Sequence, residues 1–116
     1  MSRSVLLQLA RDSIEEVLQA QRTIDKKQLL QEHPLLNETI PISISLYMGK
    51  ELKGTYTSQS EEKSLLENII LGAKKAAFED ETRGVLTTSE YLHSEVELIL
   101  KTSDGEMNES DPAIIS

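Results

Sequence analysis

Residues 39–48, TIPISISLYM, carry the clearest periodic pattern in the chain. Hydrophobic side chains occupy every second position from Ile40 to Met48, and after Pro41 the positions between them hold two serines and a tyrosine. Because successive side chains of a strand point to opposite faces, this alternation predicts a strand that is aliphatic on one face and hydroxyl-bearing on the other. The aliphatic face then needs another layer of secondary structure to cover it.

The next residues are predicted to return as a second strand. Gly49 and Lys50 supply the turn of a hairpin, and residues 51–57 form its second strand. Simple alternation places Lys53, Thr55 and Thr57 on one face of this strand and Leu52, Gly54 and Tyr56 on the other. Gly54 inside the strand indicates a bulge or a close approach of another backbone. The face of Lys53 is then either an ordinary polar surface or an edge that binds a ligand or a partner.

Helical spacing marks the segments on both sides of the hairpin. Residues 4–21 are predicted to form an amphipathic helix capped by Ser2 or Ser4, with Arg11 on its polar side. Its apolar stripe consists of Leu7, Ala10, Ile14 and Val17, widened by Leu6, Leu9 and Leu18. A shorter helix is expected over residues 25–32, and a second long helix over about 61–79.

The last third of the chain returns to strand periodicity. Thr87 and Glu90 have the spacing of a capping box, which predicts one helical turn through His93. Residues 94–101, SEVELILK, alternate again and predict a third strand. The following acidic residues are either a hairpin that turns at Asp104-Gly105 or a frayed tail.

The order helix, hairpin, helix, strand predicts an α+β fold. We expect an antiparallel sheet of three or four strands with two main helices packed on it. A chain of 116 residues has the size of one domain. The domain is expected to cover residues 1–103, and residues 104–116 are expected to be an acidic, flexible C-terminal segment.

Charge and composition exclude several classes of partner. The net charge of −8 disfavours nucleic acid and anionic membranes, because both are bound through basic side chains. The absence of cysteine removes disulfides, thiolate nucleophiles and sulfur-ligated zinc. No apolar stretch approaches the length of a membrane span, and the N-terminal apolar run is too short for a signal peptide. A cytoplasmic protein is therefore expected.

Motifs for catalysis and metal binding are incomplete. Glu90 and His93 have the spacing found in di-iron sites, but those sites need the motif twice on long helices. The stretch DGEMNESD places Glu109 where a calcium loop requires glycine. No base is placed to activate a serine or threonine, and no glycine-rich phosphate loop is present. We therefore expect no catalytic residue, no metal site and no cofactor.

Four stretches of the chain together resemble the AMMECR-like domain family. They are LLQLARDSIEEVL, the hairpin ending in KELKGTYTS, SLLENIILGAKKAAFEDE and LTTSEYLHSEVELIL. KELKGTYTS resembles the Leu-Arg-Gly-Cys-Ile-Gly signature of the family. The third stretch resembles its alanine-rich helix, which ends in Ala-Ala-Phe-x-Asp, here residues 76–80. The resemblance implies the family's fold over nearly the whole chain, and it implies pathway partners among Memo-type and radical-SAM proteins.

The sequence departs from the family pattern at the positions that carry reactive or charged side chains. Lys53 stands where the signature has arginine, and Thr55 stands where it has cysteine. The family's Asp-Pro-Arg-Phe corresponds to residues 80–83, so that Arg83 is displaced by one position. Family members also continue into a second lobe, which is not represented here. These differences argue against retained catalysis.

Three hypotheses of function follow from these patterns. The first is a non-catalytic interaction module that self-associates, as a homodimer, through a sheet edge or an aliphatic patch. The second is a small-anion or enzymatic site on the hairpin face, formed by Lys53, Gly54, Thr55 and Thr57 together with Asp80 and Arg83. The third is a domain whose missing lobe is supplied by another chain.

Overall fold

The computed structural model describes residues 4–58, 63–79 and 85–115. The helices within these residues are α1 (Val5–Gln19), α2 (Lys26–Glu32), the 3₁₀ helix η1 (Pro34–Asn37), α3 (Leu65–Phe78) and α4 (Thr88–Leu92). The strands are β1 (Ile42–Met48), β2 (Glu51–Thr57), β3 (Glu95–Thr102) and β4 (Gly105–Asp111). The order helix, hairpin, helix, strand is confirmed, and a fourth strand follows it.

All four strands pair antiparallel in one sheet, in the order β2-β1-β3-β4. Of the two alternatives for the acidic C-terminal segment, the structure contains the hairpin. Its strand β4 pairs with β3 from Val96↔Asp111 to Thr102↔Gly105. Residue 103, the predicted end of the domain, therefore lies in the turn between two paired strands.

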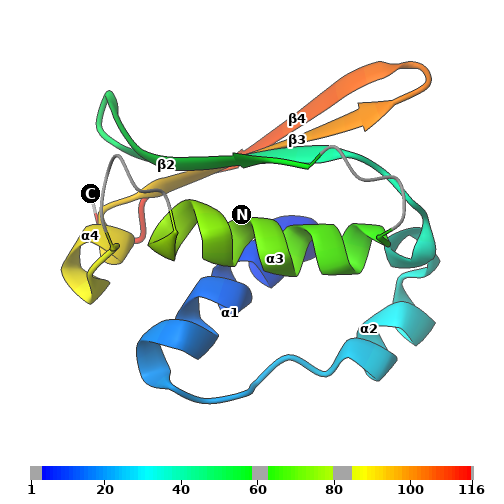
Figure 1. Cartoon of the computed structure of the whole chain (residues 1–116), viewed down its shortest axis with the longest axis horizontal. Helices are drawn as coiled ribbons and strands as arrows, with labels where there is room; N and C mark the ends of the chain where they lie inside the picture. The colour runs from blue at the N-terminus through cyan, green and yellow to red at the C-terminus, as the bar shows by residue number, and fades with distance from the viewer. Residues whose placement is uncertain (1–3, 59–62, 80–84, 116) are drawn as a thin grey trace.

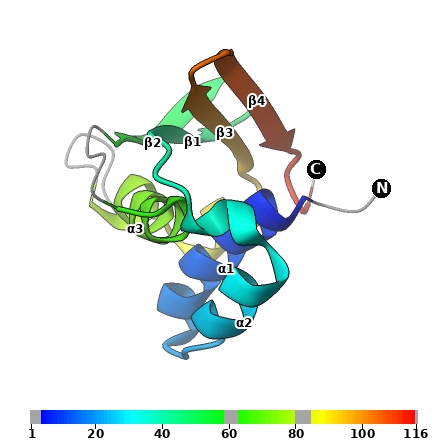
Figure 2. The ribbon, with the colours of Figure 1, turned by 90° about the vertical axis from the view of Figure 1, so that its right-hand side faces the viewer.

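The helices cover one face of this sheet (Figure 1, Figure 2). Helix α3 packs directly against β1 and β2, α1 packs against α3, and α2 lies farther from the sheet. The aliphatic residues of β1 predicted to be buried, Ile42, Ile44 and Leu46, are all completely buried in the core. They meet the apolar faces of α1 and α3, so α3 and the sheet share a single core.

Local capping sets the ends of the helices. The side chain of Ser4 accepts a hydrogen bond from the Leu7 N–H at the start of α1, and Ala20 ends this helix with a left-handed backbone (φ 54°). Thr87 and Glu90 form the predicted capping box of α4, each side chain bonded to the other's backbone N–H. Helix α3 begins at Leu65, behind the cap Ser64, rather than near residue 61. The other proposed cap of α1, Ser2, lies outside the described residues.

Two predictions for α1 are wrong. Arg11 is completely buried instead of lying on a polar surface, because Asp111 at the end of β4 supplies its counter-charge. Val17, expected in the apolar stripe, is 45% exposed, because the C-terminal end of α1 runs away from the sheet (Figure 1). Both errors arise from packing partners that the helical period alone does not specify.

Candidate functional site

A β-bulge in β2 decides the geometry of the predicted hairpin site. Leu46 pairs with Gly54, but its neighbour Tyr47 pairs with Leu52, so that Lys53 is the extra residue. A bulge interrupts the alternation of side chains between the two faces. The prediction that Lys53 shares a face with Thr55 and Thr57 is therefore wrong.

Lys53 is turned toward the helical layer and is engaged there. Its Nζ lies 2.9 Å from Oε2 of Glu90 on α4 and 3.8 Å from Oε1 of Glu51. The Lys53 side chain is only 17% exposed. The hydrogen bond from Lys53, followed by that from the Thr87 backbone N–H, lowers the pKa of the Glu90 carboxyl. This lysine joins the hairpin to α4.

Gly54 is required by packing. A Cβ at this position would lie 1.8 Å from the carbonyl oxygen of Ala76 on α3, far inside van der Waals contact. The backbones of β2 and α3 therefore approach each other at a point that only glycine allows. Gly54 is expected to mark either a bulge or a close approach of another backbone. Both are present, because the bulge residue Lys53 directly precedes Gly54.

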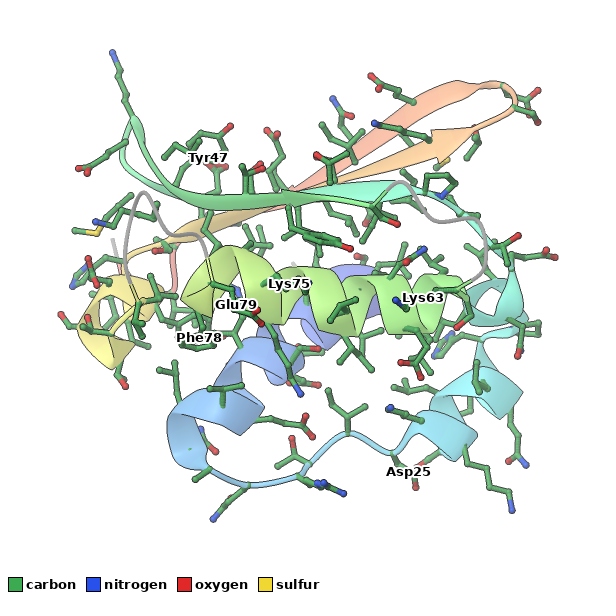
Figure 3. The ribbon with its side chains drawn as sticks, in the orientation of Figure 1. Asp25, Tyr47, Lys63, Lys75, Phe78 and Glu79 are labelled. Atoms are coloured by element: carbon green, nitrogen blue, oxygen red, sulfur yellow. The ribbon has the colours of Figure 1, made fainter. Side chains whose placement is uncertain are left out.

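Thr55 and Thr57 lie on the opposite, uncovered face of the sheet. Their hydroxyls pair across the strands with Ser45 and Ser43, each at 2.9 Å, and Thr55 also donates to the carbonyl of Ile44. The side chain of Tyr47 on β1 also points away from the helices (Figure 3). This hydroxyl-rich surface is exposed, and its hydroxyls bond mainly to one another.

The structure therefore separates the predicted site residues. Lys53 and Gly54 face the helices, whereas Thr55 and Thr57 face solvent on the other side. The other two predicted site residues, Asp80 and Arg83, lie outside the described residues. Among the described residues, no three histidine or acidic side chains gather as metal ligands. Glu90 and His93 instead bond to Lys53 and to the backbone of Ile115.

An apolar patch lies at the end of the sheet, where the β1–β2 turn meets the C-terminal segment. Met48, Gly49, His93, Ala113 and Ile115 line a depression of about 600 Å³ there. The Ile115 N–H bonds to the carbonyl of Leu92, which fixes the segment against α4. Met48 is 38% exposed and Ile115 is 45% exposed. We refer to these five residues as the end patch.

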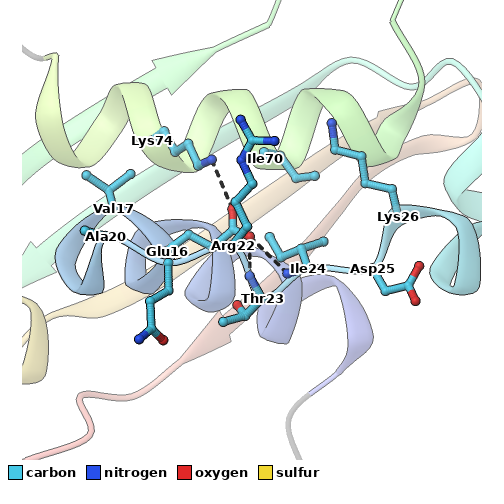
Figure 4. A pocket seen from close by; sticks show the side chains of 11 residues that line it. Glu16, Val17, Ala20, Arg22, Thr23, Ile24, Asp25, Lys26, Ile70 and Lys74 are labelled. Atoms are coloured by element: carbon cyan, nitrogen blue, oxygen red, sulfur yellow. Dashed lines mark hydrogen bonds and ion pairs between the residues drawn. The ribbon is translucent and has the colours of Figure 1, made fainter.

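A cavity of about 980 Å³ lies between α1 and α3 beneath the loop of residues 20–25 (Figure 4). Glu16 holds this loop, because its Oε2 accepts the backbone N–H groups of Thr23 at 2.8 Å and of Ile24 at 2.9 Å. Its Oε1 pairs with Lys74 on α3 at 3.2 Å. Partial burial opposes ionisation of Glu16, but these bonds outweigh it and lower the pKa of the carboxyl. We refer to this cavity as the α1–α3 groove.

The α1–α3 groove is not predicted by the sequence. In the sequence, Glu16 and Lys74 occupy ordinary polar positions of two amphipathic helices, and they are 58 residues apart. No periodicity or motif connects them. Only the packing of α1 against α3 brings the two side chains together.

The fold and the hairpin define a class of protein: a small α+β domain in which a helical layer packs on one face of a four-stranded antiparallel sheet. The sequence model described as AMMECR1 matches residues 7–112. The chain belongs to the AMMECR1 family. No curated protein matches it.

One solved structure illustrates the shared fold. The "Uncharacterized Protein PH0010 From Pyrococcus horikoshii" superposes with a TM-score of 0.72 at 24% sequence identity. The match covers 82% of this chain and 48% of that one, so the chain spans about half the length of this relative. At this identity the likeness concerns the fold.

Proposed function

We propose that this chain is a non-catalytic interaction module that associates with a second copy of itself through the end patch. The observation that carries the proposal is the gathering of exposed apolar side chains at one end of the sheet, on Met48 and Ile115. Exposed apolar side chains that gather in one place are typical of association surfaces.

Charge favours a second copy at this surface over most others. The chain carries a net charge of −8, so two copies repel each other wherever acidic surfaces meet. Four of the five residues of the end patch, Met48, Gly49, Ala113 and Ile115, carry no side-chain charge. A two-fold axis through the patch would place these uncharged residues against their own copies.

The engagement of the signature residues supports a non-catalytic role. Lys53 is paired with Glu90, and Gly54 packs on the backbone of α3. Lys53, which stands for the signature arginine, and Gly54, which agrees with the signature, therefore both have structural partners. Thr55 occupies the position of the signature cysteine and offers a hydroxyl already bonded to Ser45.

The alternative, a small-anion or enzymatic site around Lys53, Thr55 and Arg83, has less support. Lys53 and Thr55 belong to opposite faces of the sheet, and the ion pairs of Lys53 compete with a ligand for its charge. If such a site exists, a ligand that co-purifies with the chain is lost from Lys53→Ala. Native mass spectrometry detects such a ligand and a second copy in one measurement.

Sedimentation velocity at micromolar concentration tests the self-association. We expect a dimer of twice 13.0 kDa for the unchanged chain and a monomer for Ile115→Glu and Met48→Glu, because each places a carboxylate in the end patch. Leu35→Glu is the matched control, since Leu35 is 51% exposed on η1, outside the patch, and this variant should remain dimeric. Circular dichroism and a cooperative melt confirm that each variant is folded. A monomeric unchanged chain overturns the proposal.

A further inference from the structure

The α1–α3 groove has an apolar floor. Ile70 of α3 contributes to it, together with Val17 near the end of α1 and Ile24 of the connecting loop. Val17 is 45% exposed although it belongs to the apolar stripe of its helix. The volume of about 980 Å³ is at the upper end of cavities that hold small molecules.

Among the cations that line the groove, Lys74 and Lys26 have carboxylate partners and Arg22 differs from them. Lys74 is paired with Glu16 and Lys26 with Glu67, at 3.2 and 3.3 Å. The Asp25 carboxylate caps α2 by accepting the Gln28 N–H, and it points away from Arg22 and Lys74 in Figure 4. Arg22 forms no ion pair or hydrogen bond with the part of the chain that the structure describes, and its side chain extends toward α3 over the floor.

We propose that the α1–α3 groove binds an organic monoanion with an apolar body, of the alkyl-carboxylate class. Arg22 binds the carboxylate, and the alkyl chain covers Val17, Ile24 and Ile70. This inference is independent of the proposed self-association, because the groove and the end patch share no residue.

Both parts of the ligand follow from the groove. A guanidinium offers two parallel N–H groups that match the two oxygens of a carboxylate. Since Lys74 and Lys26 already have counter-ions, a single negative charge suits the site better than a dianion such as phosphate. The apolar floor is partly exposed in the free chain, so an alkyl chain removes both its own surface and that of the groove from water.

The groove also exists before the ligand arrives. Glu16 fixes the loop of residues 20–25 through two backbone hydrogen bonds and through Lys74. A preformed site does not have to order a loop upon binding, which favours affinity.

Titration of the full chain with octanoate tests the inference, with ¹⁵N chemical shifts and isothermal calorimetry as readouts. We expect saturable binding with shift changes at Val17, Ile24 and Ile70, and at least about tenfold weaker binding to Arg22→Ala. Lys27→Ala is the control, because Lys27 is an exposed cation on α2 that does not line the groove. Octylamine has the same alkyl chain with the opposite charge, and acetate has the charge without the chain; both should bind at least about tenfold more weakly than octanoate.

Several results overturn the inference: no saturable octanoate binding, equal affinity for octanoate and octylamine, or equal losses in Arg22→Ala and Lys27→Ala. Ile115→Glu separates this test from the dimer test. The inference requires that this variant keep its octanoate affinity whatever its oligomeric state, because Ile115 lies outside the groove.

Discussion

At the scale of single residues, two glycines determine how closely the sheet and its main helix approach. Gly54 on β2 meets the carbonyl oxygen of Ala76, and Gly72 on α3 meets the ring of Tyr56. A Cβ at Gly72 would lie 2.9 Å from Tyr56 Cδ2, which belongs to a movable side chain, whereas a Cβ at Gly54 would strike backbone. The glycine that this chain shares with the family signature is therefore explained by packing, independently of any chemistry.

We predict that Gly54→Ala lowers the free energy of unfolding by about 3 kcal/mol or more, because α3 has to move away from β2 to admit the new methyl group. Urea denaturation followed by circular dichroism measures the loss. The neighbouring substitution Thr55→Ala removes hydroxyl bonds to Ser45 and to the Ile44 carbonyl without adding any atom, and it should cost about 1 kcal/mol or less. Equal losses in the two variants would contradict the close approach.

At the scale of secondary-structure elements, one carboxylate connects α1, the loop that follows it and α3. Glu16 accepts two loop N–H groups and the Lys74 ammonium, and its side chain is only 11% exposed. The helix ends shortly after Glu16, at the left-handed Ala20. The path of residues 20–25, and with it the shape of the α1–α3 groove, depends on this residue.

We predict that Glu16→Gln lowers the free energy of unfolding at pH 7 by about 1 kcal/mol, because the amide oxygen accepts hydrogen bonds more weakly than the carboxylate. The folded-state pKa of Glu16 lies below the ordinary value of 4.5. Its stabilising effect is therefore complete above the unfolded pKa and is lost as the pH falls through the lowered one. Urea denaturation from pH 7 downward should show the difference between the two proteins shrink below pH 4.5. Glu106→Gln, on the exposed part of β4, is the control; a difference that persists at low pH counts against the assignment.

At the scale of the whole molecule, a buried arginine fastens the first helix to the last strand. The Arg11 Nε lies 2.8 Å from the Asp111 carboxylate, and Nη2 donates to the carbonyls of Ser94 and Pro112 at 3.1 and 2.9 Å. The guanidinium also stacks 5.2 Å from the ring centre of Tyr91. Burial, followed by the hydrogen bond to Glu15, raises the pKa of the Tyr91 hydroxyl, so this hydroxyl stays protonated near neutral pH.

We predict that Arg11→Met destabilises the fold by about 3 kcal/mol, because it leaves the largely buried Asp111 carboxylate without its counter-charge. Lys26→Met, which breaks the exposed pair with Glu67, is the matched control and should change stability by less than about 1 kcal/mol. Chemical denaturation gives both values. Hydrogen exchange should show the largest loss of protection in β4, and protection that is lost elsewhere first would argue against this fastening role.

The arrangement of layers also explains which surfaces remain for association. The helical layer covers one face of the sheet and leaves Ser43, Ser45, Thr55 and Thr57 on the other. No helix in the described part of the chain is both long and apolar enough to cross a membrane. The end patch and the α1–α3 groove lie on different parts of the molecule, so each can be changed without the other.

The sequence by itself determined the elements and their order. Alternation in residues 40–48, helical spacing in α1 and α3, and the capping box at Thr87 are local patterns, and local patterns are sufficient to specify strands, helices and their ends. The family signature also marked β2 as unusual. Each of these features is predicted from neighbouring residues in the sequence, without knowledge of which elements pack together.

Only the tertiary structure decided the sites. The bulge at Lys53 overturned simple alternation, the position of Asp111 buried Arg11, and the packing of α1 on α3 joined Glu16 to Lys74. The partners are 100 residues apart for Arg11 and Asp111 and 58 apart for Glu16 and Lys74, and no periodicity specifies these pairs. A side chain becomes buried, paired or free according to the element that packs against it, and that choice is made by the whole core.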